Sequence, residues 1–333
     1  MKVREIEELF HQNLHELGER ADALNDRVMF VVNRHINYTD ICVAKCPLCA
    51  FNNREGYLLS PEEILRKVRE VDGITEVHIV GGHNPEVGVE YFEEVFRRIK
   101  RKKPEVVIKA LTATEVYYYA KKGKMSIREF LSRLKDAGLQ AMPGGGAEIL
   151  VDSVRRKISP NKCSSDEWLR VMKIAHELGI KSNATMLFGH VEEIRHRAIH
   201  LYRLRKLQEK TGGFISFIPL VYHPENNPLG KIVREKTNPV DILKTIAVSR
   251  IALDNFRSVR AYWVMLGEKL TEIALRFGAN DIDGTVVEEK VTHAAGAETP
   301  AGLTVERLVE ICRSAGKRVG QRDTFCNILK WYA

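Results

Sequence analysis

The chain has 333 residues, of which 44% are hydrophobic, and its 52 basic and 44 acidic residues give a net charge of +8. This composition excludes a disordered chain and supplies the core of one large barrel or of two ordinary domains. The charged N-terminus lacks the apolar segment of a signal peptide, and no run reaches the ~18 apolar residues of a membrane span. We therefore expect a cytoplasmic protein with no membrane contact.

Basic residues lie close to acidic ones along the chain, as in residues 90–105. Such runs are typical of solvated helix faces, and no interleaved aromatic residues indicate a nucleic-acid surface. We expect no nucleic-acid partner. The positive charge is compatible with an acidic protein partner or an anionic substrate.

In chain order, the pattern first predicts a helix over residues 4–25, within a helical extension of residues 1–26. Eight apolar runs then alternate with amphipathic stretches, and each run predicts a buried strand. These strands are residues 27–37, 76–82, 105–112, 139–145, 181–189, 214–222, 259–266 and 281–287. Eight alternating strand and helix units predict an α/β fold, a (β/α)8 TIM-like barrel.

The helices between the strands carry recognisable start signals. Ser60 with Glu63, and Ser164 with Glu167, have the spacing of a capping box. Apolar residues at helical spacing follow the second box, namely Trp168, Val171, Met172, Ala175 and Leu178. No linker divides residues 27–333, so we expect a single barrel domain with the C-terminal segment 303–325 packed on its outside.

Three of the six cysteines, Cys42, Cys46 and Cys49, follow the first predicted strand with CxxxCxxC spacing. Thiolates are soft ligands for zinc, copper(I) or iron-sulfur clusters. A structural zinc site needs a fourth ligand, and the next histidines are about 30 residues further on. A [4Fe-4S] cluster held by three thiolates instead leaves one iron open for a substrate. The spacing therefore favours a cluster over zinc or a disulfide.

This triad, directly after the first barrel strand, resembles the radical S-adenosylmethionine (SAM) superfamily. The resemblance implies that SAM binds the open iron through its amino and carboxylate groups and is cleaved reductively. Two positions depart from the family pattern. Leu48 stands where an aromatic residue is common, with Phe51 as a possible substitute against adenine, and Gly81-Gly82 is followed by His83 instead of glutamate.

Longer stretches, among them residues 81–92, 143–150, 183–192, 211–226 and 283–297, resemble the futalosine-pathway enzymes of menaquinone biosynthesis, most closely the aminofutalosine synthase family. That resemblance covers residues 25–327. It implies a transferase that adds the 5'-deoxyadenosyl radical of SAM, a co-substrate, to 3-[(1-carboxyvinyl)oxy]benzoate. Rearrangement and loss of the carboxylate as bicarbonate or CO2 then give 6-amino-6-deoxyfutalosine. A flavodoxin or ferredoxin electron donor is also implied.

Other readings remain open. Cyclic dehypoxanthine futalosine synthase and the deazaflavin-forming synthases are sister radical SAM enzymes that share several of these stretches. A more remote alternative is a non-catalytic iron-sulfur or zinc protein. The sister enzymes typically differ in the later stretches, including residues 211–226 and 283–297, and this favours the aminofutalosine synthase family.

The resemblance also suggests site residues at the carboxyl ends of the strands, where barrel enzymes place their chemistry. For SAM we expect contacts with the backbone of Gly81 and Gly82, the Glu148 carboxylate on the ribose hydroxyls, and Thr185, besides Phe51. The dicarboxylate substrate needs donors and an aromatic wall. The candidates for these contacts are His83, Asn84, His190, His223, Lys290 and Trp263. Each of them also has an ordinary structural explanation.

Overall fold

The computed structural model describes residues 1–50 and 56–332. The strands are β1 (Arg27–Val31), β2 (Asn33–Asn37), β3 (Glu76–Val80), β4 (Val107–Ala110), β5 (Leu139–Met142), β6 (Lys181–Phe188), β7 (Phe214–Val221), β8 (Ser258–Val259), β9 (Asp281–Gly284), β10 (Arg318–Arg322) and β11 (Ile328–Tyr332). The α-helices are α1 (Val3–Leu9), α2 (Leu14–Asp22), α3 (Pro61–Arg69), α4 (Val89–Lys102), α5 (Ala113–Lys122), α6 (Ile127–Ala137), α7 (Asp152–Ile158), α8 (Ser165–Glu177), α9 (Ile194–Thr211), α10 (Pro239–Ala252), α11 (Trp263–Leu266), α12 (Glu268–Ala274), α13 (Val291–Ala294) and α14 (Val305–Arg313), with a 3-10 helix η2 (Pro228–Lys231).

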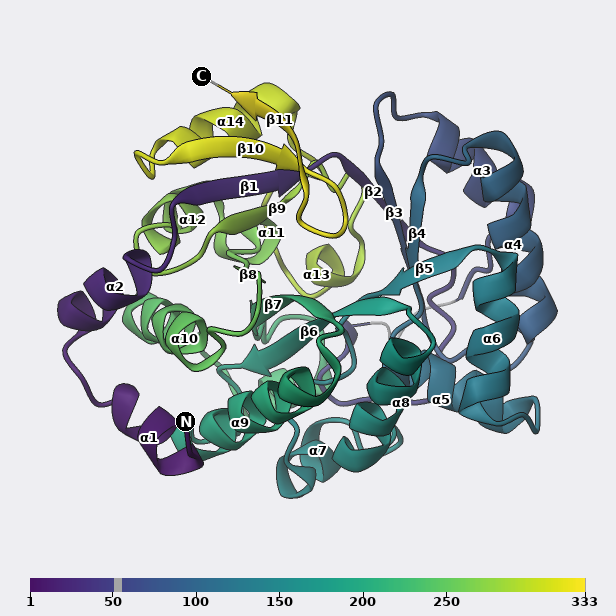
Figure 1. The fold of residues 1–333 in the computed structure, drawn as a ribbon. Coiled ribbons are helices and arrows are strands. Elements are labelled where there is room, and N and C mark those ends of the chain that lie inside the picture. The colour runs from purple at the N-terminus through teal and green to yellow at the C-terminus, as the bar shows by residue number, and fades with distance from the viewer. Residues whose placement is uncertain (51–55, 333) are drawn as a thin grey trace.

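The strands form the predicted parallel barrel. Strands β2 to β8 pair in chain order in one sheet, and β9 pairs with β1, which runs directly into β2. Between β8 and β9, the Ala261 N–H donates to the Asp281 carbonyl at 2.8 Å, and the Asn280 N–H donates to the Val259 carbonyl at 3.0 Å. The long helices, such as α4, α6, α8, α9 and α10, lie on the outer side of the strands (Figure 1). The (β/α)8 fold is therefore confirmed, with its first strand in two parts.

The first predicted strand, residues 27–37, is divided at Val32. Strand β1 uses both of its edges, one for β9 and one for β10, whereas β2 pairs with β3. The strand must therefore leave one sheet before it enters the next. The Val32 carbonyl accepts a hydrogen bond from the Thr75 N–H at 2.9 Å, which joins the start of β3 to this break.

The seventh predicted strand, residues 259–266, is wrong over most of its length. Strand β8 ends at Val259, and residues 263–266 form the single-turn helix α11. The Gly267 N–H closes that turn onto the Trp263 carbonyl at 2.8 Å, and Gly267 has a φ of 75°, which glycine adopts without strain. A short buried apolar run has no period that distinguishes a strand from one helical turn.

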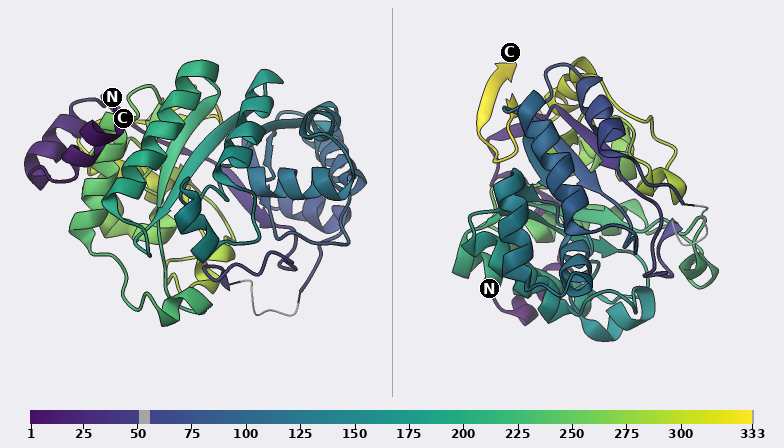
Figure 2. Two further views of the ribbon diagram at one scale, coloured as in Figure 1. Left: turned by 90° about the horizontal axis from the view of Figure 1, so that it is seen from below. Right: turned by 90° about the vertical axis from the view of Figure 1, so that its right-hand side faces the viewer.

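Both ends of the chain also differ from the prediction. The N-terminal helix is two helices, because the Asn13 side chain accepts from the N–H groups of His15 and Glu16 and starts α2 anew. Helices α1 and α2 pack against α9 and α10, and they lie at one side of the molecule in the left view of Figure 2. The C-terminal segment contributes α14 and two unpredicted strands, β10 parallel to β1 and β11 antiparallel to β10.

The predicted helix signals are confirmed. Capping boxes of Ser60 with Glu63 and of Ser164 with Glu167 start α3 and α8. The face of α8 that carries Trp168 is buried in the main core. In the part of the chain that the structure describes, none of the helices has the length and apolar character needed to cross a membrane.

Several charged side chains are buried inside the barrel. Arg322 of β10 and Asp281 of β9 are both fully buried and joined by two hydrogen bonds, one of them 3.0 Å long between Nη2 and Oδ1. Lys109 of β4 pairs with Glu76 of β3, and Arg260 pairs with Asp283 at 3.1 Å. Buried charges persist only when they are paired, so these bridges hold neighbouring strands in one arrangement.

We expect Arg322→Met to lower the free energy of unfolding by about 3 kcal/mol, because the buried Asp281 carboxylate loses two hydrogen bonds and keeps only the more distant Arg260 guanidinium, at 3.5 Å. Urea unfolding of the full chain measures the loss. Arg307→Met is the matched control, since Arg307 makes ion pairs with Glu268 and Glu310 on the surface. Exposed pairs contribute about 0–1 kcal/mol. Equal losses in the two variants would contradict this role of Arg322.

Candidate functional site

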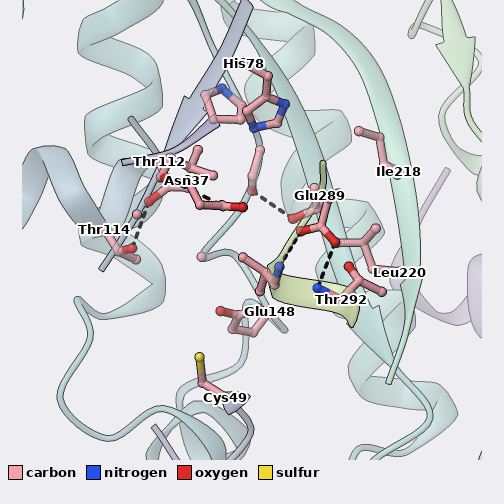
Figure 3. A pocket seen from close by; sticks show the side chains of 18 of the residues that line it. Asn37, Cys49, His78, Thr112, Thr114, Glu148, Ile218, Leu220, Glu289 and Thr292 are labelled. Carbon is pink, nitrogen blue, oxygen red and sulfur yellow. Dashed lines mark hydrogen bonds between the residues drawn. The ribbon is translucent and has the colours of Figure 1, made fainter. Parts of the chain in front are cut away.

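A cavity of about 300 Å³ opens at the carboxyl ends of the barrel strands. The loops after β2, β3, β4 and β5 contribute to its wall, and strand residues form its inner end. Figure 3 shows Cys49 at one end of this cavity and His78 at the other, with Glu148 and Glu289 between them. The volume is enough for small-molecule ligands.

All three predicted cysteines line this cavity. They lie on the loop after β2, which is fixed from two sides: the Asn161 side chain donates to the Ala44 carbonyl at 3.0 Å, and the Leu229 N–H donates to the Pro47 carbonyl at 2.9 Å. Burial raises the pKa of the Cys46 thiol to about 11. Only a bound metal or a nearby cation would therefore favour its thiolate at neutral pH.

The cysteine set fits a cluster better than a single ion. In the described residues, no three His, Cys, Asp or Glu side chains are close enough together to hold one metal ion. A cluster does not need its three ligands to meet at one metal ion, because each thiolate binds a different iron. The three sulfurs, a soft ligand set facing one cavity, could hold a cluster with one iron left open. Ala294 of α13 packs on Ala50 and Cys49 and covers this end.

Gly81 and Gly82, predicted to contact SAM, line the cavity beside the cysteine loop. A Cβ on Gly82 would lie 2.2 Å from the Ile41 carbonyl oxygen, so only glycine fits there. The Gly82 carbonyl already accepts from the hydroxyl of Tyr119 at 3.0 Å, and the Tyr38 hydroxyl lies 3.3 Å from it. Gly81 is thus the better placed of the two to offer a carbonyl to a ligand.

Glu148 also lines the cavity, near the cysteine end (Figure 3). It has a φ of 45°, an unusual backbone conformation for a residue other than glycine. The Lys162 ammonium donates to its carboxylate at 2.7 Å. Burial opposes ionisation, but Lys162 lowers the pKa of Glu148 below its ordinary value. The site therefore holds an ionised carboxylate that can accept hydroxyl donors.

Thr185 lines the cavity but its hydroxyl is already engaged, donating to the Gly144 carbonyl at 2.8 Å. Its neighbour on the same face of β6, Asn183, is 2% exposed, and its Oδ1 has no protein donor within the described chain. An orphaned buried acceptor at a cavity wall is where a ligand donor can bind. Phe51, the predicted adenine contact, lies outside the described residues.

Among the substrate candidates, His83 lines the cavity. Its ring stacks on Tyr118 with centroids 4.7 Å apart, and burial lowers its pKa to about 3. His83 is therefore neutral and can donate or accept one hydrogen bond, but it adds no positive charge.

The other five substrate candidates do not line the cavity: Asn84, His190, His223, Lys290 and Trp263. Trp263 is fully buried, with its indole N–H on the Gly284 carbonyl at 2.9 Å. The His190 ring lies 2.9 Å from the Glu192 carboxylate. These two side chains hold loops in place, which explains their position without a ligand.

The remaining three have similar local partners. The Asn84 amide donates to the Thr39 hydroxyl at 3.0 Å, and the His223 ring lies 3.1 Å from the Val221 carbonyl. Lys290 is part-exposed and paired with Glu288 at 3.2 Å. A polar residue after a strand end can turn to the loop as readily as to the barrel axis, and the sequence does not show which.

The inner end of the cavity contains residues that the sequence reasoning missed. The rings of His35 and His78 are 4.3 Å apart, and burial lowers the pKa of both. Arg260, Lys109 and Glu289 line the same region. For His78 and Lys109 a signal was present, because both interrupt otherwise apolar strands, which polar residues do only when their side chains are satisfied or used; His35 stands in a polar strand and gives no such signal.

The comparisons with known proteins agree with this geometry. Residues 36–202 match the radical SAM superfamily, and this chain therefore belongs to that superfamily. Its cofactors are a [4Fe-4S] cluster and SAM. Residues 211–330 match the CofH/MqnC C-terminal region, which makes this a radical SAM enzyme of the CofH/MqnC family.

Two kinds of curated enzyme are similar to this chain. An aminodeoxyfutalosine synthase of Thermus thermophilus is 42% identical over 89% of this chain and 82% of that protein. A 5-amino-6-(D-ribitylamino)uracil–L-tyrosine 4-hydroxyphenyl transferase of Methanosarcina barkeri is 43% identical over 93% of this chain and 85% of that protein. The two resemblances are equally close, so identity alone does not choose between these reactions.

Solved structures show the same fold. Methylornithine synthase superimposes with a TM-score of 0.71 and covers 95% of this chain and 92% of its own, at 18% identity. HydG, a maturase of the [FeFe]-hydrogenase, gives a TM-score of 0.75 over 96% of this chain and 72% of its own, also at 18% identity. At such identities the likeness concerns the fold alone.

We expect Lys162→Met to raise the pKa of the Glu148 carboxyl, because the buried carboxylate loses its cation. The folded variant then binds a proton more tightly than the unfolded chain. Its stability deficit against the wild type should therefore shrink as the pH falls from about 7 to about 5.5. Urea unfolding of the cluster-free chain at both pH values measures this. Lys157→Met, at an exposed position of α7, is the control, and a deficit that grows in acid would contradict the expectation.

Proposed function

We propose that Cys42, Cys46 and Cys49 bind the [4Fe-4S] cluster and that SAM occupies the open iron. The support is that the three thiols face one cavity together with two glycine-rich turns and a buried ionised carboxylate. When bound, the reduced cluster supplies the electron that cleaves SAM. A flavodoxin or ferredoxin would deliver that electron from outside.

For SAM, the proposed contacts are made by this chain's own backbone and side chains. The Gly81 and Gly82 edge lies beside Cys42, which suits the amino acid end of SAM. Glu148, held ionised by Lys162, suits the two ribose hydroxyls, since a carboxylate accepts both. Thr185 orders the Gly144 turn and contributes through it.

The proposed reaction is transfer of the 5'-deoxyadenosyl group of SAM to the enol ether of 3-[(1-carboxyvinyl)oxy]benzoate. Rearrangement with loss of a carboxylate then gives 6-amino-6-deoxyfutalosine, an intermediate of menaquinone biosynthesis. The aminodeoxyfutalosine synthases of Thermus thermophilus and Streptomyces coelicolor, 42% and 40% identical to this chain, support this reaction. The site itself is compatible with an anionic substrate.

The observation that carries this choice is the set of hydrogen-bond donors on the cavity wall, together with a small excess of positive charge. Among the described lining residues, four side chains are cationic, namely Lys45, Lys109, Lys162 and Arg260, and three are carboxylates, namely Glu148, Asp283 and Glu289. The lining histidines are uncharged because burial lowers their pKa values. The excess cation and the imidazole N–H groups favour an aromatic dicarboxylate over a substrate that brings its own ammonium.

A second candidate has a specific observation in its favour. The relatives from Methanococcoides burtonii and Methanosarcina barkeri, 41% and 43% identical, are named for transfer of a 4-hydroxyphenyl group from tyrosine to 5-amino-6-(D-ribitylamino)uracil. Glu289 is buried at the cavity wall and could accept the tyrosine ammonium. The more remote possibility of a non-catalytic iron-sulfur or zinc protein is not proposed, because the chain belongs to an enzyme family.

The reconstituted, reduced enzyme with SAM and 3-[(1-carboxyvinyl)oxy]benzoate is expected to form 6-amino-6-deoxyfutalosine and methionine, which mass spectrometry of the products detects. A parallel reaction with tyrosine and 5-amino-6-(D-ribitylamino)uracil is expected to give no coupled product. Formation of 5'-deoxyadenosine with unchanged benzoate would sink the proposed reaction, and a coupled uracil product would establish the second candidate.

Replacing Cys46 by alanine should remove the broad visible absorbance of the cluster and all turnover, because two thiolates hold a cluster poorly. Iron content and the absorption spectrum of the anaerobically reconstituted chain measure the loss. Cys312→Ala is the control, since Cys312 is buried in α14 and does not line the cavity. Full iron loading of Cys46→Ala would refute the assignment of the triad.

A further inference from the structure

Glu115, the third residue of α5, does not line the cavity, yet its carboxylate connects three strand ends. It is 1% exposed. One oxygen, Oε2, accepts from the N–H and the hydroxyl of Thr112, both at 2.7 Å. The other, Oε1, accepts from the Gly81 N–H at 3.1 Å and from the Tyr38 hydroxyl at 3.0 Å.

The first pair of bonds is the capping box of α5, which any N-terminal glutamate of this kind can form. The second pair is not part of a cap, because Gly81 follows β3 and Tyr38 follows β2. Glu115 therefore ties the carboxyl end of β4 to the ends of the two strands before it. Those are the strand ends that lead into the cysteine loop and the glycine turn.

Two tyrosines complete this arrangement. The hydroxyls of Tyr38 and Tyr119 are 2.9 Å apart; the Tyr119 hydroxyl donates to the Gly82 carbonyl at 3.0 Å, and the Tyr38 hydroxyl, whose proton goes to Glu115, lies 3.3 Å from the same carbonyl. The Tyr119 hydroxyl also accepts from the Asn84 N–H at 3.1 Å. The backbone of residues 81–84 is thus held through one carbonyl and two N–H groups by the Glu115 carboxylate and the Tyr119 hydroxyl, with the Tyr38 hydroxyl between them.

The same backbone segment contacts the first cysteine. The His83 N–H donates to the Cys42 sulfur at 3.3 Å, and the Val43 N–H donates back to the His83 carbonyl at 3.1 Å. Gly82 presses so closely on this loop that a Cβ would lie 2.7 Å from the Cys42 Cβ. A displacement of residues 81–83 would therefore move the N–H group that points at the sulfur.

Hydrogen bonds to ligand sulfurs are among the factors that set the reduction potential of an iron-sulfur cluster. We propose that Glu115, together with Tyr38 and Tyr119, is a positioning residue that fixes the Gly81–His83 backbone against Cys42, and so sets both the cluster potential and the affinity for SAM. This rests on the cluster and SAM assignment made above, but it does not depend on which aromatic substrate the enzyme uses.

The test uses the full chain, reconstituted anaerobically with iron and sulfide, and measures three quantities: the dissociation constant of SAM, the midpoint potential of the cluster and the free energy of unfolding. Glutamine cannot accept hydrogen bonds at both terminal atoms, so Glu115→Gln leaves donors unmet. We expect SAM binding to weaken about tenfold, the equivalent of one lost hydrogen bond. The midpoint potential should fall, because a weaker N–H donor stabilises the added electron less.

Glu167→Gln is the matched control. Glu167 is also the third residue of its helix, closes a capping box with Ser164 and accepts from the hydroxyl of Tyr117, but it has no bond to the glycine turn. It should lose stability as Glu115→Gln does, with the SAM affinity and the potential unchanged. Unchanged affinity and potential in a Glu115→Gln protein that loads its cluster would overturn the proposal.

If Glu115→Gln fails to fold or to load a cluster, Tyr119→Phe decides, with Tyr117→Phe as its control. Tyr119→Phe removes a single hydroxyl, the one that bonds Gly82 and Asn84. It should shift SAM affinity and potential in the same direction, and no shift beyond the control would overturn the proposal. Failure of Cys46 to act as a cluster ligand would instead show in the Cys46→Ala iron content, so the two ideas fail separately.

Discussion

The site depends on the close approach of two loops, residues 38–43 after β2 and residues 81–84 after β3. The Gly82 N–H donates to the Thr39 carbonyl at 3.1 Å, and no side chain fits at position 82. This contact brings the cysteine loop across the mouth of the barrel instead of outwards. Because the loop lies there, its three thiols share a cavity with the strand ends that face them.

The barrel interior has a second requirement, which is charge balance. Lys109 with Glu76, Arg260 with Asp283 and Arg322 with Asp281 place three cations and three carboxylates among apolar strands. Each pair joins different strands or strand ends, so the pairs fix how the strands meet at the inner end of the cavity. Such buried charges are stable only while each keeps its partner. The pairs therefore restrict movement of the strands at the inner end of the cavity.

The sequence was sufficient for the barrel and for the cysteine end of the site. Alternating strand and helix patterns predict which ends of the strands meet, and that placed the cysteine triad, Gly81 and Glu148 at one mouth before any coordinates. The break at Val32, the helix α11 and the pairing of β10 with β1 were not predictable in the same way. Each of these features depends on which backbone edge a neighbouring segment occupies. The spacing of hydrophobic residues along the chain carries no information about that pairing.

The direction in which a side chain points was the other feature that could not be predicted from the sequence. Because His190 and His223 follow strand ends, they were predicted to face the cavity. Each instead makes a short local contact with its own loop. His35, His78 and Lys109, within strands, do face the cavity, because alternate positions of a barrel strand point inwards. For His78 and Lys109, a polar residue inside an apolar strand was therefore the better indicator of a ligand-facing position than a polar residue in the following loop.

Substrate choice in this family can then be considered at the inner end of the cavity alone. In the proposed assignment the cysteine end binds the cluster and SAM, which leaves the choice of substrate to the other end. At the inner end, Lys109 and Arg260 already have buried carboxylate partners, and His35 and His78 are neutral. At this end a bound dicarboxylate is therefore stabilised mainly by hydrogen-bond donors, and the net positive charge around it is small. Among the lining carboxylates of the described chain, Glu289 is the one whose ion-pair partner is a histidine, His293, instead of a lysine or arginine, so its replacement would change the charge of the wall and leave the buried lysine and arginine pairs intact.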